Sequence, residues 1–351
     1  MIETETPNLL YDSMFMKACR CEPTDYTPIW LMRQAGRYMK EYRDIREKVP
    51  FLDLCKNAQL AAEVMITAVE RIGVDAAIIF SDILLILQPM GMDLEYIKNE
   101  GPVLHNPIRS FDQIRNLREV DPAESLSFVF DVVRSTRAML QPDIPLIGFA
   151  GAPFTVASYM IEGGSSKNYE NTKTLMYSEP RAWHDLMSLI SSATAKYLNG
   201  QVNAGAQALQ LFDSWVGCLS PSDYREFVLP YTKSVIDAIV DGTPLIHFGT
   251  GTAMLLELMK EAGGQIIGLD FRVELKQAWD RLGQVAVQGN LDPCVLYADY
   301  SEIEKRAKHI LDQTKGRNGH IFNLGHGILP TMSVDKVAAL VDYVHNQSSK
   351  L

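Results

Sequence analysis

Two arginines, Arg33 and Arg37, stand four residues apart directly after an apolar segment, with Gly36 between them. A guanidinium group stays charged at any working pH and can hold a carboxylate through two parallel hydrogen bonds. Six basic and three acidic residues lie from Arg33 to Lys48, which makes this stretch positive in a chain of formal net charge -10. The pattern fits a carboxylate-binding pair and a structural salt bridge equally well.

Other polar residues recur where short apolar runs end. The set includes Gln34, Ser81, Asp82, Ser214, Asp270, Asn290 and His326. Asp82 and Ser214 are equally suited to cap the helices that follow them. Glycines flank His326 on both sides, which favours a functional imidazole over a histidine satisfied in the core. Asp270 and Asn290 are more simply interpreted as turn formers or structural hydrogen-bond partners.

The elements that would position these residues are apolar runs of strand length, each followed by a segment with helical periodicity. We identify eight runs: Ile29–Met32, Ala76–Phe80, Leu146–Phe149, Ala206–Phe212, Leu245–Phe248, Ile266–Leu269, Val285–Val287 and Ile321–Leu324. They show little polar alternation, as expected of parallel strands buried on both faces. The pattern predicts an α/β fold, a single (β/α)8 barrel of the TIM type, whose active site forms where the strands end.

Amphipathic segments alternate with these runs. The helices expected include Leu60–Ile72, Asp223–Val240 after the cap Ser220-Pro221, Met254–Ala262 before Gly263, and Val334–Val344. Tyr159 lies in the apolar helix that Pro153 opens, where a core tyrosine is the more common outcome. No linker or repeated block divides the sequence, so we expect one catalytic domain over residues 1–351. Pro89–Val120 and Glu162–Glu179 are longer than a strand-to-helix connection requires and predict insertions on the catalytic rim.

Composition narrows the classes of partner. The net charge of -10 and the pI near 5.3 argue against nucleic acid or an anionic membrane, while a small anion remains possible in a locally positive pocket. The first residues lack the pattern of a signal peptide, and five scattered cysteines suit free thiols in a reducing compartment. We therefore expect a cytoplasmic protein.

Several familiar catalytic motifs are absent from the sequence. It has no Gly-x-Ser-x-Gly elbow, no His-Glu-x-x-His zinc motif and no Gly-x-x-x-x-Gly-Lys phosphate loop. Cys19 and Cys21 do not have the spacing of a standard metal-ligand pair. Arginines, an aspartate with apolar neighbours, hydroxyls and a histidine remain, and this set suits acid-base chemistry on a polycarboxylate.

Six segments, in order and over nearly the whole chain, resemble the uroporphyrinogen decarboxylase family. They are Pro28–Arg37, Phe80–Leu84, Gly151–Thr155 with Tyr159 and Glu162–Gly164, Leu211–Trp215, Gly289–Cys294 and Asn323–Gly327. The first is the signature of the family. The departures are small: Lys40 stands where the family usually has Pro, and Phe271 where it usually has Trp.

The resemblance implies a cofactor-free, metal-free (β/α)8 enzyme of haem and porphyrin biosynthesis that works as a homodimer. Its reaction would be that of a carboxy-lyase, the stepwise decarboxylation of the four acetate side chains of uroporphyrinogen to methyl groups, giving coproporphyrinogen and CO2. Carried over motif by motif, the catalytic residues would be Asp82, Arg33 and Tyr159, and the substrate-binding residues Arg37, Gln34, Phe212, Ser214 and His326.

In the implied mechanism, protonation of a pyrrole carbon turns the ring into the electron sink, so that no organic cofactor is needed. Asp82, held ionised at the centre of the macrocycle, would accept the pyrrole N–H groups and offset the positive charge. The proton would come either from Arg33 or from an ordered water, and the sequence leaves both open.

Two other functions are compatible with parts of the pattern. One is a zinc-dependent methyltransferase of the same barrel superfamily, but the place of its His-x-Cys ligand pair reads His247-Phe248-Gly249 here. The other is a protein that binds a tetrapyrrole without transforming it. Asp82 beside the arginines argues against the binder, because a carboxylate clamp has no use for a central anion.

Overall fold

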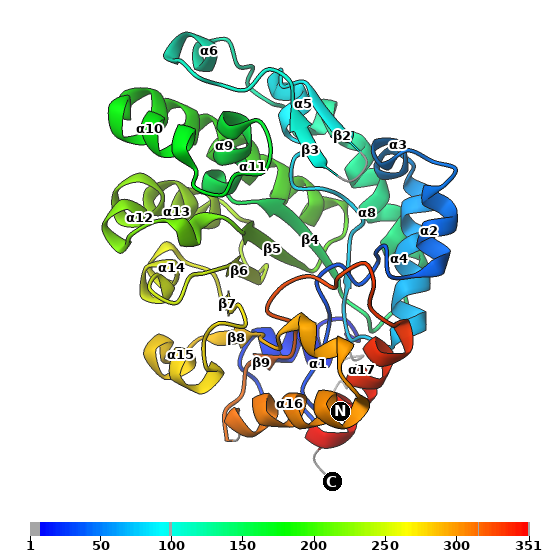
Figure 1. Ribbon diagram of the computed structural model, residues 1–351. Helices are drawn as coiled ribbons and strands as arrows, with labels where there is room; N and C mark the ends of the chain where they lie inside the picture. The colour runs from blue at the N-terminus through cyan, green and yellow to red at the C-terminus, as the bar shows by residue number, and fades with distance from the viewer. Residues whose placement is uncertain (1–7, 98–99, 315, 350–351) are drawn as a thin grey trace, which may run out of the picture.

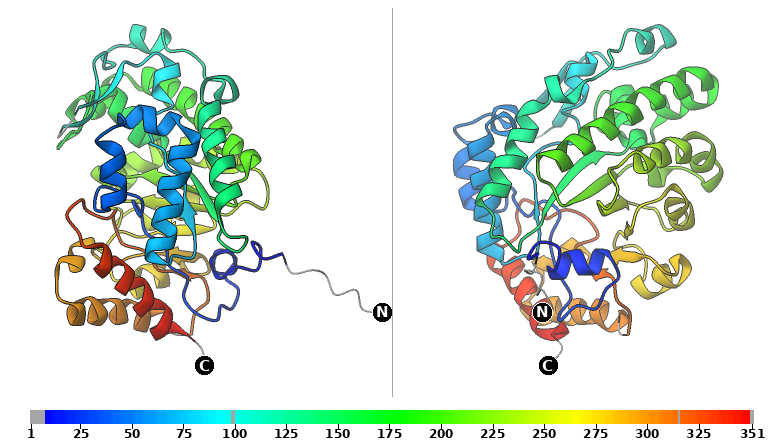
Figure 2. Two further views of the ribbon diagram at one scale, coloured as in Figure 1. Left: turned by 90° about the vertical axis from the view of Figure 1, so that its right-hand side faces the viewer. Right: turned by 180° about the vertical axis from the view of Figure 1, so that it is seen from behind.

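The main sheet has seven parallel strands in the order β1-β4-β5-β6-β7-β8-β9. The structure is a computed structural model and describes residues 8–97, 100–314 and 316–349. The strands are β1 (Ala77–Ile78), β4 (Leu146–Gly151), β5 (Ala208–Asp213), β6 (Leu245–Gly249), β7 (Ile266–Gly268), β8 (Ala286–Gln288) and β9 (His320–Ile321). The sheet curls, and the helices lie around its outside (Figures 1 and 2), which is a TIM-barrel-like arrangement.

Helices connect the strands and cover the sheet. They are α1 (Met14–Cys19), α2 (Lys40–Arg46), α3 (Phe51–Lys56), α4 (Ala58–Ile72), α5 (Leu87–Met90), α6 (Phe111–Arg115), α7 (Pro122–Ser125), α8 (Ser127–Met139), α9 (Pro153–Glu162), α10 (Glu170–Ser178), α11 (Pro180–Ala204), α12 (Pro221–Phe227), α13 (Leu229–Asp237), α14 (Leu256–Ala262), α15 (Leu275–Leu282), α16 (Tyr300–Gln313) and α17 (Val334–Ser348), with short 3₁₀ helices η1 (Val216–Cys218) and η2 (Pro293–Tyr297).

Side-chain bonds show how far the sheet curls. The Trp30 indole N–H donates to Gln288 Oε1 at 2.8 Å, and the Gln288 amide donates to Gln210 Oε1 at 3.0 Å. Gln210 is on β5 and Gln288 on β8, with β6 and β7 between them in the sheet. The two glutamines meet because the curl brings these strands face to face across the interior, where all three side chains are buried.

The run predicted first, Ile29–Met32, does not form a strand. Ile29 makes an isolated parallel bridge to Phe322, and its carbonyl accepts the Asp75 N–H at 2.8 Å. The chain then turns at Met32, because the next residue, Arg33, has a positive φ of 65°. Each of the other seven predicted runs overlaps a strand, although β9 shares only Ile321 with the predicted run Ile321–Leu324.

Two helix ends follow from their caps, and one predicted helix is wrong. Ser220 accepts the Asp223 N–H at the start of α12, and Gly263, with φ 115°, ends α14. The helix predicted over Asp223–Val240 is two helices, because Pro230 has no N–H to donate and the chain breaks at Val228.

The long connection after β1 folds into structure of its own. The strands β2 (Leu94–Ile97) and β3 (Gly101–Leu104) pair in an antiparallel hairpin, with α6 beyond it at the top of Figure 1. The helix α10 occupies the second half of Glu162–Glu179. Across the described ranges, we find no helix with the length and apolar character needed to cross a membrane.

Candidate active site

Arg33 and Arg37 are exposed, and neither forms an ion pair with a carboxylate among the described residues. The salt-bridge alternative is therefore wrong for the part of the chain that the structure describes. The left-handed backbone at Arg33 is uncommon for a residue with a Cβ. It places the Arg33 side chain against the backbone of Gly327, where a Cβ would come within 2.5 Å of Arg33 Cδ. Both arginines are free to bind an anion.

Asp82 is half-buried just beyond β1, and its Oδ1 accepts the Leu84 N–H at 2.9 Å. The carboxylate thus caps the following turn, which resembles the capping role that the sequence allowed for Asp82. Its second oxygen, Oδ2, can accept a hydrogen bond from a ligand. Burial raises the pKa of Asp82 above its ordinary value. Interactions with the Tyr96 hydroxyl, the Leu84 N–H and the Arg33 guanidinium each lower that pKa and favour the anion.

Tyr96 is a residue that sequence reasoning missed. It lies on β2, its ring contacts that of Phe51 at 4.7 Å between centroids, and its hydroxyl is buried. The hydroxyl acts on the Asp82 carboxylate but does not reach full hydrogen-bond geometry with it. The sequence offered one signal, the position of Tyr96 inside the long segment Pro89–Val120.

Tyr159 is half-buried rather than a core residue, and its ring stacks on Trp215 with centroids 3.8 Å apart. Burial and the Asp82 charge raise the pKa of Tyr159, whereas Arg33 lowers it, so the phenol stays protonated beside the carboxylate. The backbone N–H of Trp215 donates to Thr155 Oγ1 at 3.2 Å, and the Thr155 hydroxyl donates to Asp213 Oδ1 at 2.9 Å. The buried Asp213 therefore fixes the position of Trp215 through Thr155, a role that sequence reasoning missed.

His326 is half-buried beside Gly327, on the loop after β9. Burial is the largest cause that lowers the pKa of His326, and the Arg33 and Arg272 cations lower it further. A neutral imidazole results, which can donate one hydrogen bond and accept another. The loop packs closely against the chain that follows β7. A Cβ at position 325 would lie 2.2 Å from the Phe271 nitrogen, so only glycine fits there.

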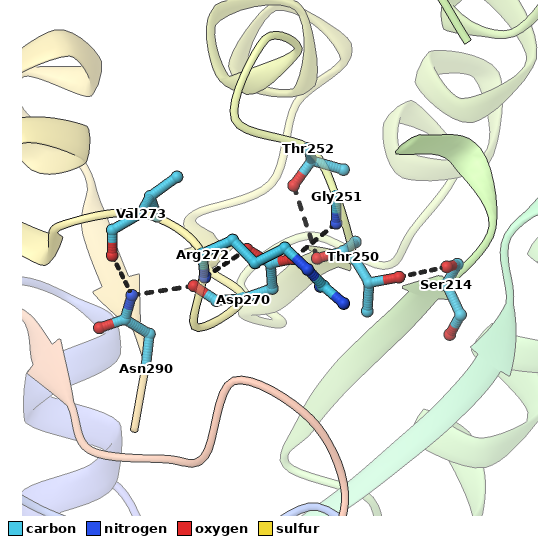
Figure 3. Close-up of polar contacts among 9 residues, drawn as sticks. Ser214, Thr250, Gly251, Thr252, Asp270, Arg272, Val273 and Asn290 are labelled. Carbon is cyan, nitrogen blue, oxygen red and sulfur yellow. Dashed lines mark hydrogen bonds and ion pairs between the residues drawn. The ribbon is translucent and has the colours of Figure 1, made fainter. Parts of the chain in front are cut away.

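Ser214 follows β5, and its carbonyl accepts the Thr250 hydroxyl at 2.5 Å (Figure 3). Asp270, after β7, accepts the Gly251 N–H at 2.6 Å. Asn290 donates to the Asp270 carbonyl at 2.9 Å. The predicted structural roles of Asp270 and Asn290 are confirmed, since these bonds join the loops at neighbouring strand ends.

The two remaining predicted residues have different surroundings. Gln34 is fully buried, where its side chain accepts the Leu31 N–H at 3.1 Å and donates to the Ala76 carbonyl at 3.1 Å. These bonds hold the Arg33 turn against β1. Phe212 is half-buried, with its ring edge-to-face against Phe149 at 5.5 Å.

Electrostatic contacts link Asp82, Arg33, Tyr159 and His326 in one group. Arg37 acts on the Tyr42 phenol instead, at the edge of this group. No cluster of three or more His, Cys, Asp or Glu side chains suited to a metal occurs within residues 8–97, 100–314 and 316–349. At the place of the methyltransferase ligands, His247 is buried, with Nε2 4.0 Å from Asp213 Oδ2.

Comparison with known proteins decides the family. A family model described as "Uroporphyrinogen decarboxylase (URO-D)" matches residues 10–347. This chain belongs to the uroporphyrinogen decarboxylase family. A uroporphyrinogen decarboxylase of Sorangium cellulosum is 54% identical over 334 residues, covering 95% of each chain. One of Carboxydothermus hydrogenoformans is 50% identical, covering 95% of this chain and 96% of its own.

A solved structure shows that this family shares its fold with other enzymes. A methyltransferase from Methanosarcina mazei superposes with a TM-score of 0.80 at 19% identity, covering 95% of this chain and 99% of its own. At this identity the likeness shows the TIM-barrel-like fold alone.

Proposed function

We propose that this chain decarboxylates the four acetate side chains of uroporphyrinogen to methyl groups, giving coproporphyrinogen and CO2. Membership of the family supports this reaction. The observation that carries it is the half-buried Asp82 carboxylate within electrostatic reach of Arg33, an exposed arginine that forms no direct ion pair among the described residues. An anion inside a cationic rim fits a substrate that is negative at its edge and becomes positive at its centre.

Asp82 stabilises the positive charge that forms during the reaction. Proton addition to a pyrrole carbon makes the ring cationic, and the electrons of the broken C–CO2 bond then neutralise it and leave an exocyclic methylene. The methylene becomes the methyl group when it takes up a proton and the ring carbon gives up the proton that it had gained. No organic cofactor is required for this step. Asp82 accepts the pyrrole N–H groups, and a preorganised group of this kind contributes about 3 to 4 kcal/mol to catalysis. Tyr159 orients the carboxylate or the reacting acetate.

The peripheral carboxylates of the substrate bind to the rim. Arg33 and Arg37 hold acetate or propionate groups, and Ser214 and His326 hydrogen-bond further ones. Gln34 holds the turn at Arg33 through its bonds to the backbone of Leu31 and Ala76. Phe212 lines the pocket. The exposure of Arg33 favours an ordered water as the proton donor, because a guanidinium holds its proton too tightly to donate it well in contact with solvent.

The proposal extends to the architecture around the site. The segment Pro28–Trp30 closes a (β/α)8 barrel at the position of an eighth strand, although it forms only a bridge; the pairing of Ile29 with Phe322 supports this closure. Residues 1–351 form one catalytic domain, with Pro89–Val120 and Glu162–Glu179 as insertions on its rim. The protein acts in the cytoplasm as a homodimer, with neither nucleic acid nor membrane as a partner.

One assay separates the three candidate functions. The protein is incubated anaerobically with uroporphyrinogen and a metal chelator, and the product carboxylates are counted after chromatography. We expect products with seven, six, five and finally four carboxylates. Unchanged substrate that stays bound would favour the tetrapyrrole-binding protein, and unchanged substrate together with stoichiometric zinc in protein purified without added metal would favour the zinc-dependent methyltransferase.

A further inference from the structure

Arg272 is a basic residue at the strand ends to which the family comparison assigns no role. It follows β7, two residues after Asp270. Its neighbour Phe271 lies directly against the loop that carries His326, because a Cβ on Gly325 would meet the Phe271 nitrogen at 2.2 Å. Arg272 thus shares an edge of the molecule with the proposed substrate-binding residues.

The guanidinium of Arg272 is anchored on one side only. Its Nη1 donates to Asp270 Oδ2 at 2.6 Å, and its carbon lies 4.4 Å from the centre of the Phe271 ring. The Arg272 side chain is 54% exposed, whereas that of Asp270 is 1% exposed. Figure 3 shows the side chain extending across Asp270 from its own backbone. One N–H is therefore used, and the remaining donors are held ready for a second anion.

The surroundings of Arg272 show which anion would suit it. Its charge reaches the His326 imidazole and lowers the pKa of His326, as the charge of Arg33 does. Asp270 also accepts the Gly251 N–H, and the neighbouring Thr250 binds the Ser214 carbonyl. If Arg272 served only to neutralise the charge of Asp270, that role would account for the ion pair between them. It does not explain why the free side of the guanidinium shares the electrostatic environment of His326 with Arg33.

We propose that Arg272 binds a substrate carboxylate that does not react, the propionate of a pyrrole ring. This inference rests on the proposed function. A cation that grips the reacting acetate stabilises the ground state more than the transition state, because that carboxylate leaves as neutral CO2. A third arginine at the rim, paired with a buried carboxylate, is better used to bind a group that keeps its charge throughout catalysis.

The test uses Arg272→Gln in the full-length protein, with Arg281→Gln as a matched control. Arg281 is also a partly exposed arginine bound to a carboxylate, that of Glu257 at 2.7 Å, but it lies on the outer helix α15. We measure kcat and KM for uroporphyrinogen and the inhibition constant of coproporphyrinogen, which carries only propionates. Arg272→Gln should raise both KM and the inhibition constant about tenfold, with a much smaller change in kcat. Arg281→Gln should change neither.

Three results would overturn the inference or its basis. If KM and the inhibition constant of Arg272→Gln both equal those of the wild type, Arg272 is a structural counter-ion. If KM rises while coproporphyrinogen inhibits as before, the residue binds a reacting acetate. A wild-type protein that makes no coproporphyrinogen would refute the proposed function itself. Should Arg272→Gln fail to fold, Arg272→Lys keeps the charge beside Asp270 but loses the fork, and the same rise in both constants is required of it.

Discussion

At the scale of single residues, the left-handed backbone of Arg33 is the feature with a visible cost. A residue with a Cβ pays about 1 to 2 kcal/mol for that conformation. The turn is retained with support from Gln34, whose side chain bonds to the backbone of both Leu31 and Ala76. This backbone conformation places the guanidinium near Asp82 and packs the Arg33 side chain against Gly327. The strain therefore serves the site.

The Tyr96 hydroxyl tunes the charge of Asp82. Its interaction lowers the pKa of Asp82, which burial has raised. Activity that requires the anion falls as the pH drops through this raised pKa, so the acid limb of kcat/KM should lie above the ordinary aspartate value of about 3.9. In Tyr96→Phe the lowering contribution is gone. We expect the acid limb to move to higher pH, measured from the pH dependence of initial rates.

Tyr177→Phe is the control for this change. Its hydroxyl donates to Asp223 at 3.0 Å on the surface, so the substitution removes the same group elsewhere. The Tyr177→Phe profile should match that of the wild type. An acid limb that stays in place in Tyr96→Phe, or moves to lower pH, would show that Tyr96 does not act on Asp82.

The sequence predicts residues better when their signal is local. The arginine pair around Gly36 and the glycines around His326 are short motifs, and in the structure the charge of Arg33 acts on both Asp82 and His326. Tyr96 has no comparable signal, because the β2–β3 hairpin that delivers it is set by tertiary packing. Asp213 was hidden for the same reason, since its partner Thr155 is 58 residues away.

At the scale of elements, strands buried on both faces were the easiest to find. The predicted run Leu245–Phe248 and strand β6 share their first residue, and β4 is buried at every position. Prediction from the sequence was wrong for elements whose backbone conformation is not determined by the hydrophobic pattern. Ile29–Met32 is as apolar as a strand, but the turn at Arg33 leaves it one bridge. Pro230 divides a helix that periodicity alone made continuous.

The strand β9 makes the fold sensitive to acid. It contains His320, which is buried, donates to the Gly289 carbonyl at 2.8 Å and has a pKa lowered by burial to about 4. The unfolded chain binds this proton at the ordinary pKa of about 6.5, so stability falls as the pH drops from about 6.5 to about 4. We expect His320→Gln to lose about 3 kcal/mol of this pH dependence, measured by urea unfolding at pH 7 and pH 4.

His309→Gln provides the comparison, because the His309 side chain is 60% exposed on α16. It should unfold with the same pH dependence as the wild type. If His320→Gln also keeps the full wild-type dependence, the protonation of His320 is not coupled to unfolding.

At the scale of the whole molecule, charge is distributed unevenly. The chain has a formal net charge of -10, yet the exposed arginines Arg33 and Arg272 lie at the strand ends, where Arg33 acts on Asp82 and Arg272 pairs with Asp270. Total charge therefore argues against nucleic acid and anionic membranes as partners, but it does not locate the site. The curl of the sheet does that, because it brings segments from residue 33 to residue 326 to one end of the molecule.

The most direct test of the account compares Asp82→Asn with the wild type. Asparagine keeps an oxygen for the Leu84 N–H but removes the charge. We predict that kcat falls about 10²- to 10³-fold, while the dissociation constant for uroporphyrinogen, measured anaerobically at equilibrium, changes less than about threefold. A kcat that stays within a few-fold of the wild type, or a loss that appears only in substrate binding, would contradict the role of Asp82 as the anion that stabilises the pyrrole cation.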